Sequence, residues 1–319
     1  MKGNLKMLLV LGAAAGIFMA CGNKTNESMM STEKSTVSAK KDAGSSAAAE
    51  KAAESEGKNP TEAVKTEEKQ VTEGTVSSTA DMSHYEKGRR GRLWLPVPRS
   101  SEYQTVSDVD YNAGNAKAEM NTDELGNQML YVEWDENAEP ADRVVKLNFN
   151  VKREAVIRPE LKEDDKEEFT DEVKKYLEPS KNLPLNDQLK GKAKEVTEGK
   201  TTDLEKARAI YDWVIANMNR DENVKGCGEG DVCSLLDTTM SGKCTDINSM
   251  FVALCRASGI PAREHFGICI NADDITKNQH CWAEFYLKGT GWVSADAADV
   301  LKAVLKNNWT KDQEESKDK

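Results

Sequence analysis

The stretch "GKCTDINSMFVALCRASGIPARE", from Gly242 to Glu264, is the most informative part of this 319-residue sequence. Its apolar residues recur at the spacing of one helix face: Ile247, Met250, Phe251, Leu254 and Cys255. Gly259 is typical of a helix C-terminus, and Pro261 prevents the helix from continuing. The pattern therefore predicts a helix from about Lys243 to Ser258 whose apolar face packs in a core.

Cys244 lies in the first turn of this predicted helix. The unpaired backbone N–H groups and the positive end of the helix dipole favour a thiolate there and lower the pKa of the cysteine. Cys255 shares the apolar face, but at about 1.5 Å per residue it lies roughly 16 Å away, too far for a disulfide. We interpret Cys244 as a reactive thiol and Cys255 as a core residue.

A thiolate nucleophile needs a base, and the sequence contains only three histidines. Two of them, His84 and His265, lie outside any further catalytic pattern, whereas His280 opens the strand-like run "QHCWAEFYL". This run turns at "KGTG" and returns as "WVSAD". A hairpin with a three-residue loop, Lys288 to Thr290, would place Asp296 on the same sheet face as His280. Along the chain, the order is then nucleophile (Cys244), base (His280) and orienting acid (Asp296).

Together, "GKCTDINSMFVALCRASGIPARE" and "QHCWAEFYLKGTGWVSAD" resemble the core domain of the transglutaminase-like superfamily, over about Glu205 to Val300. Members share a cysteine, a His-x-Trp-x-Glu strand and a Trp-x-x-x-Asp strand. The resemblance implies an α+β, papain-like fold in which the helix bearing the cysteine packs on an antiparallel sheet. It places the nucleophile on Cys244, the general base on His280 and the orienting acid on Asp296. The implied activity is acyl transfer on amide or peptide bonds of a protein or peptide substrate through a thioester, without a cofactor.

Two features depart from the pattern of the family. Asp296 is followed by Ala297 where relatives usually have proline, and the sequence ends soon afterwards where relatives commonly continue with further sheet. The core could therefore be truncated at its C-terminus. In that case the alternative to an enzyme is a catalytically inactive surface binding module that retains the fold. Hydrolysis by a peptidase or amidase and crosslinking to an amine both remain open.

The other cysteines allow two further interpretations. A zinc site could use Cys227, Cys233, Cys244, His280 and Cys281, but their spacing is irregular and contains no C-x2-C pair, so no metal site is expected. In the glycine-rich segment "KGCGEGDVC", Cys227 and Cys233 would form a local disulfide or remain two free thiols.

Three residues near the motifs are expected to be structural. Trp282 and Glu284 occupy alternate positions on one strand face, where they would pack and hydrogen-bond beside the site. Asp246 is expected to stabilise the helix from its first turn rather than join the reacting groups.

The N-terminus has the pattern of an export signal. Lys2 and Lys6 precede an apolar stretch, Met7 to Ala20, that is short for a membrane span. It ends in "IFMAC", which resembles the lipobox of bacterial lipoproteins, in which the cysteine, here Cys21, is lipidated. Residues 1–21 would then be a lipoprotein-type signal, and the protein would be anchored to a membrane of the cell envelope. An ordinary cleaved signal is the alternative.

The remaining chain divides by composition. Residues 22–83 are rich in Ser, Thr, Ala, Lys and Glu and predict a disordered tether. Residues 84–158 contain short alternating segments such as "QMLYVEW" and "RVVKLNFNV", which predict a β-rich, sandwich-like domain. Residues 159–319 form the transglutaminase-like domain and include an amphipathic helix with a capping box at Thr202 and Glu205. The formal net charge of −11 argues against nucleic acid as a partner.

Overall fold

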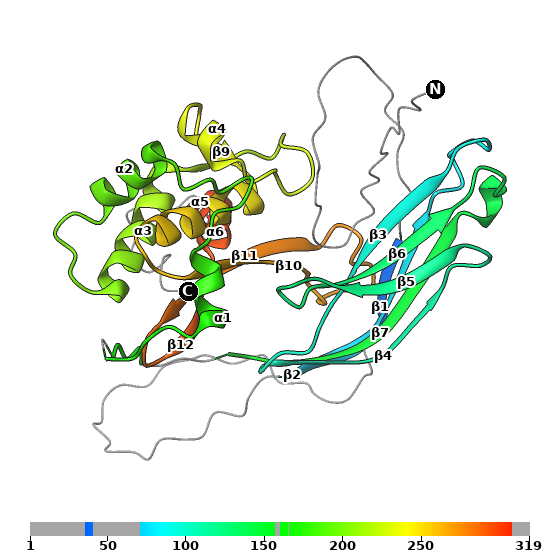
Figure 1. The fold of residues 1–319 in the computed structure, drawn as a ribbon, viewed down its shortest axis with the longest axis horizontal. Helices are drawn as coiled ribbons and strands as arrows, with labels where there is room; N and C mark the ends of the chain where they lie inside the picture. The colour runs from blue at the N-terminus through cyan, green and yellow to red at the C-terminus, as the bar shows by residue number, and fades with distance from the viewer. Residues whose placement is uncertain (1–35, 41–70, 157–159, 165, 308–319) are drawn as a thin grey trace, which may run out of the picture. The chain divides into compact units, whose positions relative to one another are not determined.

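The computed structural model describes residues 36–40, 71–156, 160–164 and 166–307, which belong to two compact units (Figure 1). The first unit contains the described residues up to 156 together with Cys269–Asn278, and the second contains those from 160 to 268 and from 279 to 307. The predicted signal and Cys21 lie outside the described residues. Within the described part of the chain, no helix is both long and apolar enough to span a membrane.

The first unit, which includes the region predicted to be rich in β-strands, consists of two antiparallel sheets. One has the order β1-β2-β7-β4 and the other the order β3-β6-β5. The strands are β1 (Thr36–Lys40), β2 (Val71–Asp81), β3 (Gly91–Val97), β4 (Gln104–Asn112), β5 (Lys117–Thr122), β6 (Gln128–Trp134) and β7 (Val144–Glu154), with a short 3₁₀ helix η1 (Pro140–Asp142) before β7. Strands β6 and β7 bury alternate residues, which gives each sheet one core face.

The structure corrects the predicted extent of the tether. Strands β1 and β2 both lie within residues 22–83, so the prediction of disorder there is wrong for 36–40 and for 71–81. Strand β2 pairs with β7 along its whole length and buries Val76 and Ala80. Composition misled the prediction because an antiparallel partner supplies backbone hydrogen bonds, so that a few apolar residues on one face hold the strand in place.

The second unit combines helices with a three-stranded antiparallel sheet of order β10-β11-β12, so the predicted α+β class is confirmed. Its elements are α1 (Asp171–Lys174), η2 (Lys175–Leu177), α2 (Asp187–Val196), α3 (Asp203–Asn217), β8 (Asn219–Arg220), α4 (Val232–Leu236), β9 (Ser241–Gly242), α5 (Cys244–Ala257), β10 (Ala262–Ile268), β11 (Gln279–Leu287), β12 (Gly291–Ala295) and α6 (Ala297–Asn307). Helix α5 packs against β10 and β11 and also against α2, α3 and α6. In Figure 1, these helices gather around α5 beside the sheet.

The predicted signals at helix ends are present. Thr202 Oγ1 accepts a hydrogen bond from Glu205 N, and the Glu205 carboxylate accepts one from Thr202 N, which completes the capping box of α3. Helix α5 starts at Cys244, and Gly259 follows its end with a φ of +83°, a conformation that favours glycine. Cys255 is completely buried in the core, as predicted.

Helix α5 buries polar as well as apolar residues because neighbours surround it on all sides. Its buried polar residues are Thr245, Asp246, Asn248 and Ser249. A buried polar side chain without a partner is costly, so each is expected to have a structural or chemical role. All four lie within two turns of Cys244, which directs attention to this end of the helix.

Candidate active site

The hairpin of β11 and β12 has the predicted register. Leu287 pairs with Gly291, which leaves the three-residue loop Lys288 to Thr290, and Ala283 pairs with Ala295. Asp296 follows directly after β12, and its Oδ2 accepts a hydrogen bond of 2.5 Å from His280 Nε2. The register thus brings the predicted base and the predicted acid together.

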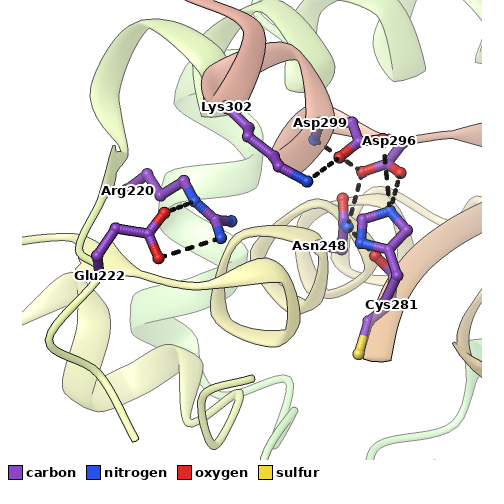
Figure 2. A network of polar contacts seen from close by, with 8 residues as sticks. Arg220, Glu222, Asn248, Cys281, Asp296, Asp299 and Lys302 are labelled. Atoms are coloured by element: carbon purple, nitrogen blue, oxygen red, sulfur yellow. Dashed lines mark hydrogen bonds and ion pairs between the residues drawn. The ribbon is translucent and has the colours of Figure 1, made fainter. Parts of the chain in front are cut away.

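A set of donors fixes the orientation of the Asp296 carboxylate (Figure 2). Its Oδ1 accepts hydrogen bonds from Asn248 Nδ2 at 3.2 Å and from Asp299 N at 3.1 Å, in the first turn of α6. Asn248 Nδ2 also donates to the backbone oxygen of Cys281 at 2.8 Å. Because these donors occupy Oδ1, the other oxygen is left for His280. The carboxylate of Asp299 is less closely involved, at 3.8 Å from His280 Nε2.

Asn248 is a site residue that the sequence analysis did not identify. It lies one helical turn after Cys244, so the two side chains share a face of α5. This spacing was the available signal, but without the position of β11 it could not be distinguished from a buried structural amide.

Cys244 and His280 are the predicted nucleophile and base. Hydrogen bonds from the thiols of Cys227 and Cys281 and from His280 lower the pKa of Cys244 far below its usual range, although burial opposes this change. The hydrogen bond to Asp296, and then that to Cys244, raises the pKa of His280 to about 10. Since Asp296 occupies Nε2, Nδ1 is the nitrogen available to Cys244. These opposite shifts favour a thiolate on Cys244 and an imidazolium ion on His280 at neutral pH.

Two further cysteines lie beside the Cys244 sulfur. The Sγ atoms of Cys227, Cys244 and Cys281 all lie within 4.8 Å of one another, and all three cysteines are free thiols. The hydrogen bond to Cys244 raises the pKa of Cys227 to about 11, so its thiol stays protonated and acts as a donor. Cys233, the other candidate for a local disulfide, is also a free thiol and instead lies 3.3 Å from the amide nitrogen of Asn186.

Asp246 positions the loop that carries Cys227. Its Oδ1 accepts hydrogen bonds from Glu229 N and Gly230 N, both at 2.9 Å, and its Oδ2 accepts one from Lys243 N at 3.0 Å. The expectation that Asp246 is a structural acid of the first turn is consistent with these bonds, but its role extends to the neighbouring loop.

The glycine at position 228 is required by this arrangement. Gly228 has a φ of +98°, and a Cβ atom there would lie 1.9 Å from Asp246 Oδ2. The loop can therefore approach the carboxylate only where no side chain is present.

We expect Asp246→Ala to lower the free energy of unfolding by about 3 kcal/mol, because three backbone N–H groups in or near the core lose their acceptor. Denaturant titration of the full chain measures this loss. Asp171→Ala provides the matched control, since Asp171 is also a first-turn acid but its side chain is fully exposed. Equal stability of the two variants would contradict the structural role of Asp246.

Trp282 and Glu284 join β10 to β11, as expected of structural residues. The Trp282 ring stacks on His265 with 5.2 Å between the ring centroids. Glu284 Oε2 accepts hydrogen bonds from His265 Nε2 and from Arg263 Nε and Nη2. Burial raises the pKa of Glu284, but the bond to His265 and the charges of His265 and Arg263 outweigh it and bring the pKa to about 2.

Comparisons with known proteins place this site in a family. The fold and the match to the family model of the transglutaminase-like superfamily, over residues 190–297, define an α+β core of that class. An uncharacterized protein of Haemophilus influenzae is 36% identical over 247 residues, which cover 69% of this chain and 67% of that protein. The chain belongs to the transglutaminase-like superfamily. Cys244, His280 and Asp296 all lie within the matched range.

One solved structure shows a similar fold at low sequence identity, and a second resembles the chain more weakly. A proposed cysteine protease from Cytophaga hutchinsonii matches with a TM-score of 0.54 and 20% identity, over 73% of this chain and 78% of that one. The periplasmic domain of TgpA from Pseudomonas aeruginosa has a TM-score of 0.42 and 16% identity, over 75% and 74% of the two chains. Only the first match is strong enough to support a shared fold.

Proposed function

We propose that this protein is a cysteine enzyme that transfers acyl groups from amide or peptide bonds through a thioester on Cys244. The observation that carries the proposal is the hydrogen-bonded series from Cys244 through His280 to Asp296. The position of Cys244 in the first turn of α5 supports it, because the helix terminus stabilises negative charge on the sulfur.

The proposed acylation step uses the ion pair directly. The Cys244 thiolate attacks the carbonyl carbon of a carboxamide or peptide bond and forms a tetrahedral intermediate. The backbone N–H of Cys244, among the first of α5, is the candidate donor to the oxyanion. His280 then transfers its Nδ1 proton to the departing amine as the C–N bond breaks, which leaves a thioester and a neutral imidazole.

Deacylation regenerates the pair. His280 Nδ1 accepts a proton from water or from a primary amine as that nucleophile attacks the thioester. The C–S bond breaks, the Cys244 thiolate leaves, and the imidazolium remains hydrogen-bonded to Asp296. Water gives hydrolysis, as in a peptidase or amidase, whereas an amine gives a crosslink. Labelled casein incubated with and without a biotinylated primary amine distinguishes the two outcomes.

Thiol labelling tests whether Cys244 is activated. After brief treatment with iodoacetamide at pH 6, we expect peptide mapping to find Cys244 more heavily labelled than the exposed Cys269, although Cys244 is only 5% exposed. Cys255 should be the least labelled, because complete burial raises its pKa well above the ordinary value. If Cys244 is labelled no faster than Cys255, the thiolate is absent and an inactive binding module becomes the better account.

We also propose that the protein is exported and anchored to a membrane of the cell envelope through a lipid on Cys21, where it meets protein or peptide substrates. The support is the apolar stretch before Cys21 and its lipobox-like end. Cys21→Ser should move the protein from the membrane fraction to the soluble fraction of bacteria that express it. An unchanged distribution would exclude this anchor.

A further inference from the structure

We infer that Cys227, Cys244 and Cys281 form a binding site for zinc. The site goes beyond the proposed acyl transfer, because it requires only the three thiols and not a working enzyme. It also differs from the expectation drawn from cysteine spacing, which argued against a metal site.

The distances between the sulfur atoms fit a thiolate-bound metal ion. All three Sγ atoms lie within 4.8 Å of one another. A zinc ion about 2.3 Å from each sulfur holds sulfur pairs about 3.8 Å apart in a tetrahedral site and about 4.0 Å apart in a trigonal plane. The cluster therefore needs to contract by no more than about 1 Å to bind zinc with normal bond lengths. Three protein ligands would leave a fourth position open.

Cys244 begins α5, and the two segments that carry Cys227 and Cys281 are each fastened to this helix. The loop bearing Cys227 is fixed by a hydrogen bond of 2.9 Å from Thr245 N to Cys227 O, in addition to its bonds to Asp246. The start of β11 is fixed by Asn248, which donates to Cys281 O, and Thr245 Oγ1 lies 3.2 Å from Cys281 Sγ. Such support reduces the entropy lost when the sulfurs gather around an ion.

Zinc binding to the three cysteines displaces protons. The three cysteines are free, and a cysteine binds zinc as a thiolate, so each thiol proton has to leave. Binding of one Zn²⁺ forms three S–Zn bonds and releases one H⁺ to solvent for each cysteine that was a thiol, with no change in oxidation state. The resulting zinc thiolate group carries one negative charge. Affinity should therefore rise with pH as protons are lost more readily.

Bound zinc would also prevent the proposed reaction. The Cys244 electron pair that attacks the carbonyl would instead be shared with the metal ion, so the nucleophile would be masked until the ion is removed. This consequence rests on the proposed function, whereas the binding site itself does not.

Metal titration of the reduced, metal-free full chain tests the site. We expect one zinc ion per chain in competition with a chromophoric chelator, and sulfur-to-cobalt charge-transfer absorption when Co²⁺ replaces zinc. Cys227→Ser and Cys281→Ser should each weaken binding by at least about 100-fold, as expected when one of three thiolates is lost. Cys269→Ser is the matched control and should bind zinc with the same affinity as the unchanged protein. Circular dichroism of each apo variant establishes that it is folded.

Two results would overturn the inference. One is unchanged zinc affinity in folded Cys227→Ser protein, which would place the ion elsewhere, such as at His280, Asp296 and Asp299. The other is the absence of sulfur-to-cobalt absorption from the reduced protein. Zinc binding combined with an inert Cys244 when the metal-free protein is labelled would support the metal site and contradict only the proposed enzyme.

Discussion

Replacement of Cys244 by alanine is expected to abolish acyl transfer, with a loss of about 10⁴-fold or more in kcat/KM. The variant has no sulfur to form the thioester, and water in the same position is a far weaker nucleophile than a thiolate. The loss is measured with labelled casein, by release of soluble peptides and by incorporation of a biotinylated amine. Thioester formation is common to both assays, so both should fall together.

A matched control separates the nucleophile from a general effect of removing a thiol. Cys269→Ala removes an exposed cysteine and should retain full activity in both assays. Cys244 is buried among the residues of the core, so the stability of Cys244→Ala is measured alongside its activity. A folded Cys244→Ala protein that still releases peptides would falsify the proposed thioester route.

Asp296→Asn is expected to lower kcat/KM by about 10²-fold to 10³-fold. In the unchanged protein, Asp296 Oδ1 accepts from Asn248 Nδ2 and from Asp299 N. An asparagine side chain would keep its oxygen at these two donors and turn its NH₂ group toward His280 Nε2. Nε2 could then no longer donate, so the neutral ring would carry its proton on Nδ1, facing Cys244. In this tautomer His280 cannot act as a base toward the nucleophile.

The pH profile distinguishes this electrostatic role from a structural one. His280 must be protonated to donate to the departing amine, so the raised pKa predicts that kcat/KM falls only above about pH 10. The bond to Asp296 makes the largest contribution to this pKa, so Asp296→Asn should move the alkaline limb to lower pH. Asp299→Asn is the control, because the Asp299 carboxylate is 3.8 Å from His280 Nε2 and contributes less to this pKa, so its alkaline limb should shift less than that of Asp296→Asn. A profile of Asp296→Asn with an unshifted alkaline limb would exclude the assigned role.

Most of the core fold could be predicted because its signals are local. The apolar periodicity of α5, the capping box at Thr202, and the positive-φ glycine after α5 depend on residues within a few positions of one another. The register of the β11–β12 hairpin is local too, because a three-residue loop sets which residues face one another. From that register, the alternation of side chains placed His280 and Asp296 on one face.

Signals that depend on distant partners were missed. The low apolar content of residues 71–81 indicated disorder, yet the segment is strand β2, because β7 pairs with it from more than sixty positions further along the chain. The alternating pattern of a strand with one exposed face is a weak signal in the sequence. Composition also gives no information about whether another strand has a free edge with which the segment can pair.

Residues of the candidate active site that depend on distant partners were missed in the same way. Cys244, His280 and Asp296 follow from motifs in the chain, whereas Asn248, Asp246 and the grouping of Cys227 with Cys281 require the packing of a loop, a helix and a strand on one another. Irregular cysteine spacing gave no indication of three adjacent sulfurs, because distance in space is set by how α5 lies against β11 and the loop before α4. Sequence periodicity determines which face each residue takes within its own element, and only the packing between elements determines which faces meet.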